Sequence, residues 1–381
     1  VANAVAIPLT GWLARRLGEV RLYFAASALF VLSSFLCGIS SSLGMLIFFR
    51  LVQGVSAGPI LPLSQSLLLA CYPPEKRGLA LSLWAMVVVL APILGPILGG
   101  WICDNYHWGW IFFVNVPVGA LGLLLLRAPL HGRETPTGKA PIDVVGLVLL
   151  VVGIGCLQLM LDEGKDNDWF ASGYIVTLGV AAVVGIAFFI AWELTEKHPV
   201  VNLSLFRHRN FTVGTICISL GFLLYFASVV LLPLMLQARL SYTAMWAGFS
   251  LGIGVALFFM PLTTIILSGL PNSDLAAASS LSNCVRVLAG SIGSSLVTTM
   301  WERREALHHA RLTEGINDYN PVWDTALRAL EQFGMTGPQA KAWIANEITR
   351  QGFILSFDEL FWLGGVLFVL LSGLVWLARR G

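Results

Sequence analysis

Long apolar runs separated by short polar segments dominate the pattern of this chain. A helix needs about 20 mostly apolar residues to cross a bilayer, and eleven runs reach or approach that length. We expect one helix in each of the runs at residues 1–14, 22–40, 44–70, 79–102, 109–127, 142–161, 173–194, 211–237, 244–269, 277–301 and 352–378. The first run is too short for a full crossing, so we expect an earlier part of that helix to be absent.

The composition agrees with this pattern. Only 12% of the 381 residues are charged and 57% are hydrophobic, which gives a mean hydropathy of +0.80. Soluble domains carry about 25% charged residues. The sequence therefore predicts an all-α integral membrane protein.

The sequence lacks the motifs of several other classes of protein. Its six cysteines stand singly and no cluster of histidines accompanies them, so neither a disulfide framework nor a metal site is indicated. It contains no phosphate-binding loop, which an ATP-driven pump would need. It also has no Ser-His-Asp or HExxH arrangement. We therefore expect a protein that is not an enzyme and has no catalytic residue.

Lysine and arginine alternate between the loops. The loops of one set hold most of these residues, and the opposite short loops hold only Lys165 and Arg239. The positive-inside rule places the first set in the cytoplasm. Its basic residues, with those of the tail, are Arg15, Arg16, Arg21, Lys76, Arg77, Arg127, Arg133, Lys139, Lys197, Arg207, Arg209, Arg379 and Arg380.

A hydrophilic segment at residues 302–350 then falls on the outer, periplasmic side. Parts of it, at residues 324–333 and 338–349, have the pattern of amphipathic helices. Two interpretations remain open for this segment. It is either a solvated cap over the outer mouth of the protein or a docking surface for another protein.

Two stretches resemble each other at a nearly constant spacing. Pro62-Leu-Ser is echoed by Pro261-Leu-Thr, and Val89-Leu-Ala by Val287-Leu-Ala, 199 and 198 residues later. Parallel halves of this kind are typical of one class of transporter fold. In this chain the two copies are six spans apart. A fold of two six-helix halves with two inserted spans would place them eight spans apart. A gap in the chain near residues 248–249 would explain the difference.

This repeat predicts three parts. We expect an N-terminal helical half at residues 1–127, two inserted spans at 142–194 and a C-terminal helical half at 211–381. The segment at 302–350 belongs to the last of these.

The run at 79–102 contains a stripe of small residues. Ala91, Gly95 and Gly99 recur at every fourth position and so lie on one side of a helix. Such a stripe lets a neighbouring backbone approach closely, which is how membrane helices pack. A tightly packed structural helix would explain it. In this run, however, a Gly-Pro pair is followed four residues later by a Gly-Gly pair, which resembles the antiporter motif of the major facilitator superfamily. The residues of this motif are Ala91, Pro92, Gly95, Pro96, Gly99 and Gly100.

The loop after the first run resembles the cytoplasmic gating loop of the same superfamily. Gly11, Arg16, Gly18 and Arg21 keep its pattern. An acidic residue usually stands where this chain has Arg15, so the charge-relay role that the resemblance implies there is in question. A basic loop at this place would also follow from the positive-inside rule alone.

Residues 46–58 resemble the arginine motif of helix four. Arg50, Gln53 and Gly54 share one helical face. A cation at membrane depth is costly, almost always turned inward and functional by default. The resemblance implies that Arg50 adjusts the proton affinity of an acidic residue on helix one, upstream of Val1. A structural hydrogen bond from Arg50 to backbone carbonyls is the alternative.

Further stretches match the fourteen-span drug:proton antiporter family within this superfamily. Residues 107–117 resemble the signature that opens helix six, and residues 142–146 and 162–170 match the two inserted spans. The detail is most similar to the EmrB-type exporters. That resemblance implies a bacterial inner membrane, cytoplasmic N- and C-terminal ends, a periplasmic adaptor (an EmrA-type membrane fusion protein) and a TolC-type outer-membrane channel.

We interpret the chain as a proton-coupled exporter of hydrophobic or amphipathic compounds, with the proton gradient in place of a cofactor, that works by alternating access. A non-transporting receptor or scaffold, suggested by Arg15, is one alternative, and proton-linked uptake is another. Arg286 is a second cation in an apolar run, which would attract an anionic substrate or pair with a helix end. The polar residues expected in the substrate cavity are Gln53, Gln65, Asn115, Gln158, Tyr225, Asn283 and Arg286.

Overall fold

The computed structural model describes residues 2–138, 141, 143–238, 265–266, 274–314, 316 and 320–374. All regular secondary structure in these residues is helical. Eight of the helices are long and apolar enough to cross a membrane. Ten of the eleven predicted spans coincide with helices, so those predictions are confirmed. The run at 244–269, with the suspected gap near 248–249, lies almost entirely outside the described residues.

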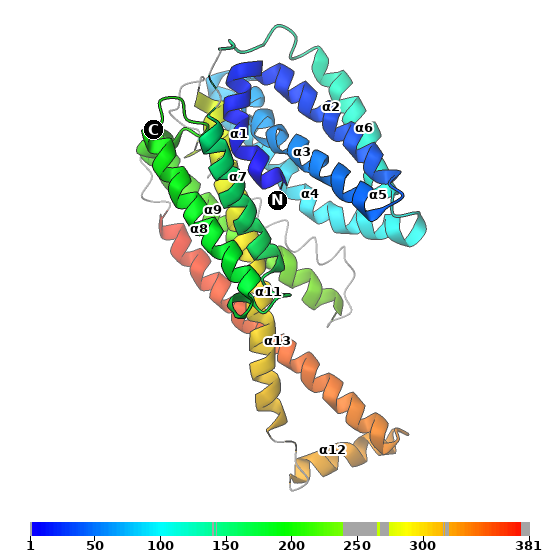
Figure 1. Cartoon of the computed structure of the whole chain (residues 1–381). Helices are drawn as coiled ribbons and strands as arrows, with labels where there is room; N and C mark the ends of the chain where they lie inside the picture. Colours follow the sequence, from blue (N-terminus) through cyan, green and yellow to red (C-terminus); the bar gives the residue numbers. More distant parts are fainter. Residues whose placement is uncertain are drawn as a thin grey trace.

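The N-terminal part consists of six α-helices and one short 3₁₀ helix (Figure 1). The first, α1, has 16 residues, and α5 and α6 follow one another to make one span. The elements are α1 (Ala2–Leu17), α2 (Glu19–Gly38), α3 (Leu43–Cys71), η1 (Pro74–Lys76), α4 (Arg77–Asn105), α5 (Trp110–Phe113) and α6 (Asn115–Arg127).

The rest of the described chain contains the predicted pair of inserted spans, followed by longer helices. Two of them, α11 and α13, have 39 and 38 residues. The elements are α7 (Val144–Glu163), η2 (Trp169–Ala171), α8 (Gly173–Thr195), η3 (Leu203–Arg207), α9 (Arg209–Ala238), α11 (Leu275–Thr313), α12 (Pro321–Gln332) and α13 (Gly337–Leu374).

Short polar side chains define where several helices begin. The side chain of Ser42 accepts a hydrogen bond from the backbone N–H of Met45 at the start of α3, and that of Asp143 accepts one from Gly146 at the start of α7. Asn320 caps α12 in the same way, and a proline follows it. Such caps satisfy N–H groups that have no partner within the helix.

Glycines allow the helices to pack closely at several crossings. A Cβ added to Gly58 of α3 would lie 2.5 Å from the Cβ of Ala6 in α1, and one added to Gly153 of α7 would lie 3.1 Å from the carbonyl carbon of Gly185 in α8. A Cβ on Gly293 of α11 would overlap the backbone of α9. Close backbone approach replaces the hydrophobic drive that is absent between helices in lipid.

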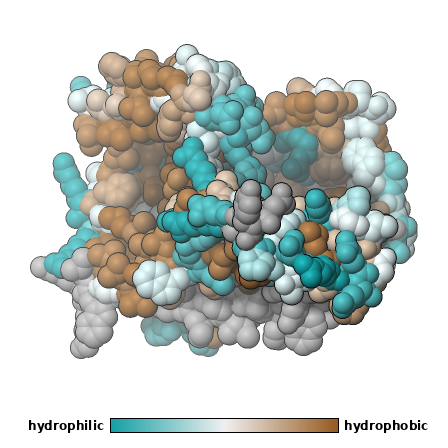
Figure 2. Space-filling model, turned by 90° about the horizontal axis from the view of Figure 1, so that it is seen from below, coloured by the Kyte–Doolittle hydropathy of each residue, from teal (hydrophilic) through white to brown (hydrophobic). Residues whose placement is uncertain are grey.

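The outer faces of the bundle are apolar. Leu32 of α2, Leu124 of α6 and Val183 of α8 are 54%, 70% and 70% exposed. Figure 2 shows apolar surface on the flanks of the molecule and polar surface in the middle of this end view. These faces suit contact with lipid, because helices satisfy all their backbone groups internally.

A helical hairpin projects from one end of the bundle (Figure 1). At 1.5 Å per residue α11 is about 58 Å long, nearly twice the roughly 30 Å of a bilayer core. It packs against α13 where Trp301 donates a hydrogen bond to the carbonyl oxygen of Phe353 at 3.1 Å and His308 contacts Glu359 at 3.2 Å. Beyond this point the two helices diverge and α12 joins them. The helices predicted at 324–333 and 338–349 are thus confirmed, and we call residues 302–350 the projecting hairpin.

Candidate functional site

The basic loops lie together at one end of the bundle. The backbone N–H of Gly138 donates to the carbonyl oxygen of Arg15 at 2.9 Å, and the Arg15 side chain donates to the carbonyl oxygen of Pro199 at 3.5 Å. Lys165 lies at the opposite end, where its ammonium group contacts Glu302 of the projecting hairpin at 2.7 Å. Among the described residues, the loops of Arg15 and Arg133 thus lie at one end of the bundle and Lys165 at the other, as the alternation of charge predicted.

The N-terminal helices meet α11 near the basic-loop end. A Cβ added to Gly11 of α1 would lie 3.0 Å from the Cα of Ala277, so the two backbones almost touch. One turn further along α11, the hydroxyl of Ser280 donates to the carbonyl oxygen of Ile7 at 2.6 Å. We call this contact the α1–α11 seam. It holds together two segments that are more than 260 residues apart in the chain.

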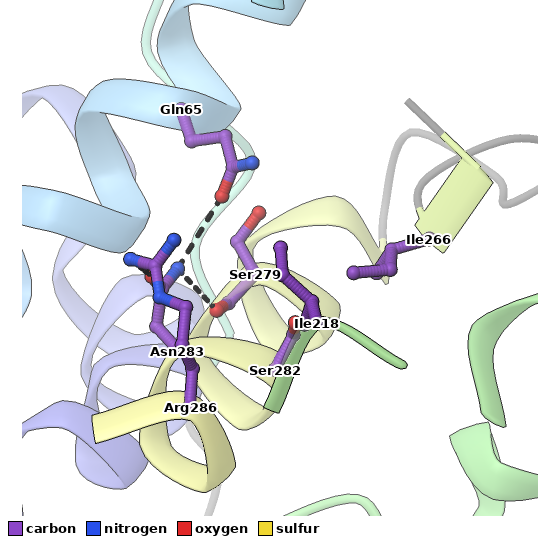
Figure 3. A pocket seen from close by; sticks show the side chains of 7 residues that line it. All are labelled: Gln65, Ile218, Ile266, Ser279, Ser282, Asn283 and Arg286. Atoms are coloured by element: carbon purple, nitrogen blue, oxygen red, sulfur yellow. Dashed lines mark hydrogen bonds between the residues drawn. The ribbon is translucent and has the colours of Figure 1, made fainter. Parts of the chain in front are cut away.

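A polar cluster continues this seam between α3 and α11 (Figure 3). The side-chain amide of Asn283 donates to the side-chain oxygen of Gln65 at 3.3 Å and to the carbonyl oxygen of Ser279 at 2.7 Å. The guanidinium of Arg286 donates in turn to the side-chain oxygen of Asn283. These residues line a cavity of about 10 Å³ together with Ile218, Ile266 and Ser282.

Aromatic rings cover the Arg286 guanidinium. Its central carbon lies 4.4 Å from the ring centre of Phe222 in α9 and 5.9 Å from that of Trp84 in α4. Tyr225 packs against Phe222, with the ring centres 5.8 Å apart. The structure therefore brings four of the seven predicted cavity residues into one neighbourhood: Gln65, Tyr225, Asn283 and Arg286.

The other three predicted cavity residues lie elsewhere. Gln158 of α7 donates to Asp162 and to Ser291 of α11, both at 3.1 Å. Gln53 is buried within the N-terminal part, and Asn115 stands half-buried at the start of α6. None of the three lines the cavity beside Arg286, because their helices turn them toward other neighbours.

Arg50 is exposed, contrary to the expectation that it turns inward. Its guanidinium donates to the side-chain oxygen of Gln53 at 2.8 Å and lies 5.4 Å from the ring centre of Phe112. Gln53 donates in turn to the hydroxyl of Ser34 at 2.5 Å. The partner of Arg50 is thus a side-chain amide rather than a backbone carbonyl.

Glu134 organises the gating loop, a role that the sequence pattern did not indicate. Its carboxylate accepts the backbone N–H groups of Val20 and Arg21, at 3.1 and 3.0 Å, at the start of α2. Gly18 has φ +90° and a Cβ there would overlap Glu134, so only glycine fits comfortably. A count of basic residues alone could not find this acid. The sequence did contain one signal. Glu134 lies in a loop at the same end of the bundle as the start of α2, and the first N–H groups of a helix attract a carboxylate.

Arg15 lies among acids from two other elements. Besides donating to Pro199, it interacts electrostatically with Asp274 at the start of α11 and Glu193 at the end of α8. Arg16 is also exposed, and its guanidinium lies 5.4 Å from the ring centre of Trp12. The side chain at position 15 is therefore bonded to the Pro199 segment and is attracted by two carboxylates of other elements.

The small-residue stripe of α4 is open on its described sides. A Cβ added to Gly95 or Gly99 would meet no described atom within 4 Å. For Ala91, Pro92, Pro96 and Gly100 the structure describes the helical backbone alone. The close helix approach expected at this stripe is therefore not seen among the described residues, whereas the glycines of α1, α3 and α11 do show it.

A second cavity, of about 440 Å³, opens between α2, α3 and α6. Its walls are mostly apolar, and no predicted cavity residue lines it. Within the residues that the structure describes, no group of three His, Cys, Asp or Glu side chains is placed to hold a metal ion.

Comparison with known proteins agrees with this architecture. A family model described as "Major Facilitator Superfamily" matches residues 1–294. The multidrug export protein EmrB of Escherichia coli strain K12 is 51% identical over 440 aligned residues, which cover 100% of this chain and 86% of the relative. The fatty acid resistance protein FarB of Neisseria gonorrhoeae is 49% identical over 439 residues, with coverage of 100% and 87%.

A relative with the same function is known from a third organism. The multidrug export protein EmrB of Haemophilus influenzae is 49% identical over 440 residues, which cover 100% of this chain and 86% of the relative. These matches extend over the whole chain, and they identify a multi-pass membrane transporter rather than an enzyme. The chain belongs to the major facilitator superfamily, among its EmrB-type multidrug exporters.

Proposed function

We propose that this multidrug efflux transporter exchanges hydrophobic or amphipathic compounds for protons by alternating access. The observation that carries the proposal is the α1–α11 seam. Its described contacts are a close approach of two backbones, one hydrogen bond and a buried apolar cluster that includes Ile7 and Ala278, continued by the bond between Gln65 and Asn283. An interface of small residues and few polar bonds can separate at low cost, which alternating access requires.

The proposed motion is a rocking of the N-terminal half, residues 1–127, against the C-terminal half, residues 211–381. The inserted pair at 142–194 packs on α11 through Gln158 and Ser291, which are 3.1 Å apart. Relatives align over 440 residues although this chain has 381, so the alignment includes positions that this chain lacks, as a gap near residues 248–249 would require.

Arg50 is the proposed coupling residue. Its guanidinium is fixed by Gln53 and Phe112 but remains exposed on one side. Gly54, one turn further along α3, contacts Ala2 at the beginning of α1: a Cβ there would lie 2.9 Å from the Ala2 Cβ. The exposed side of the Arg50 guanidinium can therefore receive a carboxylate. In this proposal, that carboxylate binds and releases the proton that is exchanged for the substrate.

We further propose a bacterial inner membrane as the location, with the basic-loop end in the cytoplasm. The projecting hairpin is then periplasmic and serves as the docking surface for an EmrA-type adaptor, which continues to a TolC-type channel. Three exposed apolar side chains support this role: Val322, Phe333 and Trp343 are 71%, 86% and 48% exposed. They lie beyond the length of helix that a bilayer covers.

The test is transport by purified protein in liposomes with an imposed pH gradient and a fluorescent lipophilic cation. We expect gradient-dependent movement that stops when the gradient is collapsed. Binding without gradient-dependent movement would favour a receptor or scaffold, and movement in the opposite direction would favour uptake.

A variant tests the role of Arg50 in the same assay. Arg50→Gln keeps a hydrogen-bond donor for Gln53 but removes the charge, so we expect gradient-driven export to fall while binding persists. Arg127→Gln, which changes an exposed arginine in the last turn of α6, is the matched control. Wild-type export by Arg50→Gln would exclude Arg50 from coupling.

A further inference from the structure

Arg286 is a buried cation for which the described protein supplies no carboxylate. Its side chain lies in the first third of α11 and the residue is 4% exposed. The described hydrogen-bond partner of the guanidinium is the neutral amide of Asn283, and the Nε–H group is buried without a partner. None of the described ion pairs includes Arg286.

The stretches of sequence just before α11 carry no acidic side chain other than Asp274, which stands at the start of that helix. Residues 239–264 and 267–273 contain no aspartate or glutamate. Charge is costly at membrane depth, and an unpaired buried charge is more costly than a paired one. Arg286 is also not satisfied by a helix end, because its described partners are a side-chain amide and two aromatic faces.

We propose that Arg286 is the anchor for the negatively charged head group of an amphipathic substrate. This assignment rests on the proposed export function and names the class of compound that the cluster accepts. A guanidinium presents several N–H donors in one plane and matches the two oxygens of a carboxylate or sulfonate. The orphan Nε–H is the donor that such an oxygen would satisfy.

The neighbours of Arg286 explain when the head group binds. Gln65 of α3 and Asn283 of α11 are bonded to each other across the interface, at 3.3 Å. The cavity beside them is about 10 Å³, room for about one water molecule. When α3 and α11 separate, both amides lose this bond, and the guanidinium and amides together face the opened space. The two helices can join again, and the bond between Gln65 and Asn283 can re-form, only after the head group has left or if it fits between them.

The aromatic faces explain how the charge is tolerated in the closed state. Phe222 and Trp84 lie within the range of cation–π attraction, at 4.4 and 5.9 Å. The same rings are an apolar wall for the remainder of a ligand. The cluster therefore favours a compound with an anionic head and an apolar body over an inorganic anion.

The test uses two probes with the same alkyl chain and opposite charge: radiolabelled octanesulfonate and octyltrimethylammonium. Equilibrium binding is measured on the purified full chain, without a pH gradient. We expect the wild type to bind octanesulfonate more tightly than butanesulfonate, and Arg286→Gln to weaken octanesulfonate binding about tenfold to a hundredfold. Binding of octyltrimethylammonium should stay the same or strengthen.

Arg286→Lys keeps the charge but loses the planar donors, so its octanesulfonate affinity should fall between those of wild type and Arg286→Gln. Unfolding temperatures of all variants show whether the fold persists, and Arg304→Gln, in the projecting hairpin, is the matched control. The proposal is overturned by unchanged octanesulfonate binding in Arg286→Gln, by an equal loss of both probes, or by displacement with millimolar chloride regardless of chain length.

Gradient-driven export of octyltrimethylammonium is measured separately on the same preparations. If wild-type protein binds octanesulfonate through Arg286 but exports neither probe, the export function fails while the anchor stands. If it exports the cation and Arg286→Gln leaves anion binding unchanged, the anchor fails while the export function stands.

Discussion

The α1–α11 seam makes a quantitative prediction for Gly11→Ala. The added Cβ would lie 3.0 Å from the Cα and 3.2 Å from the Cβ of Ala277, closer than the 3.5–4.0 Å or so of a favourable carbon contact. Overpacking of this kind costs about 1–3 kcal/mol. The cost falls only on the state in which α1 and α11 touch, so the balance between joined and separated states should shift about 5- to 150-fold toward separation.

Cys284 is a suitable reporter for this shift. It is buried, and it stands seven residues after Ala277 and four after Ser280, on the side of α11 that faces α1. In a protein that keeps Cys284 as its single cysteine, the alkylation rate with N-ethylmaleimide measures how often the seam opens. We expect Gly11→Ala to raise this rate about 5- to 150-fold.

The matched control is Gly122→Ala in α6, where an added Cβ meets no described atom within 4 Å. Both substitutions gain up to about 1 kcal/mol of helix propensity, which is common to the joined and separated states. Equal alkylation rates in the two variants would refute the argument that the seam is limited by contact at Gly11.

Three further predictions concern other parts of the bundle. A Cβ added at Gly95 meets no described atom within 4 Å. For Gly95→Leu we therefore expect normal insertion and unfolding temperature but reduced gradient-driven export, because the stripe packs in another state of the cycle; normal export would remove its mechanical role. Glu134→Ala removes the acceptor for two N–H groups at the start of α2, and we expect unfolding measurements to show a loss of about 1 kcal/mol, partly restored in Glu134→Gln. Lys165→Ala breaks an ion pair whose side chains are 39% and 49% exposed, so its effect in the same measurement should stay below about 1 kcal/mol; a larger loss would mean that the pair fixes the projecting hairpin.

Residue spacing predicted individual helices well and contacts between them poorly. Arg50 and Arg286 have similar sequence settings, each an arginine within an apolar run. The structure leaves Arg50 exposed and buries Arg286 under two aromatic rings. Nothing in the spacing distinguished them, because a helix that is apolar on all sides has no face that must point to the core.

The polar cluster illustrates the same limit. Gln65 and Asn283 are 218 residues apart and meet because α3 and α11 cross at that level. Gln158 was an equally good candidate in the sequence, yet it bonds to Ser291 on another part of α11. Which amides meet depends on the rotation and height of each helix, and both are set by the small residues at the crossings.

The sequence by itself determined the membrane spans, the end of the bundle at which each loop lies, and the membership of the superfamily. Apolar length and basic charge act against the bilayer one segment at a time, so they can be interpreted locally. Only the tertiary structure decided that Glu134 caps α2, that Gly11 rather than the Gly95 stripe lies in a tight described contact, and that no described carboxylate pairs with Arg286. These properties depend on distant neighbours, and each is settled by close packing between segments that the sequence pattern does not relate.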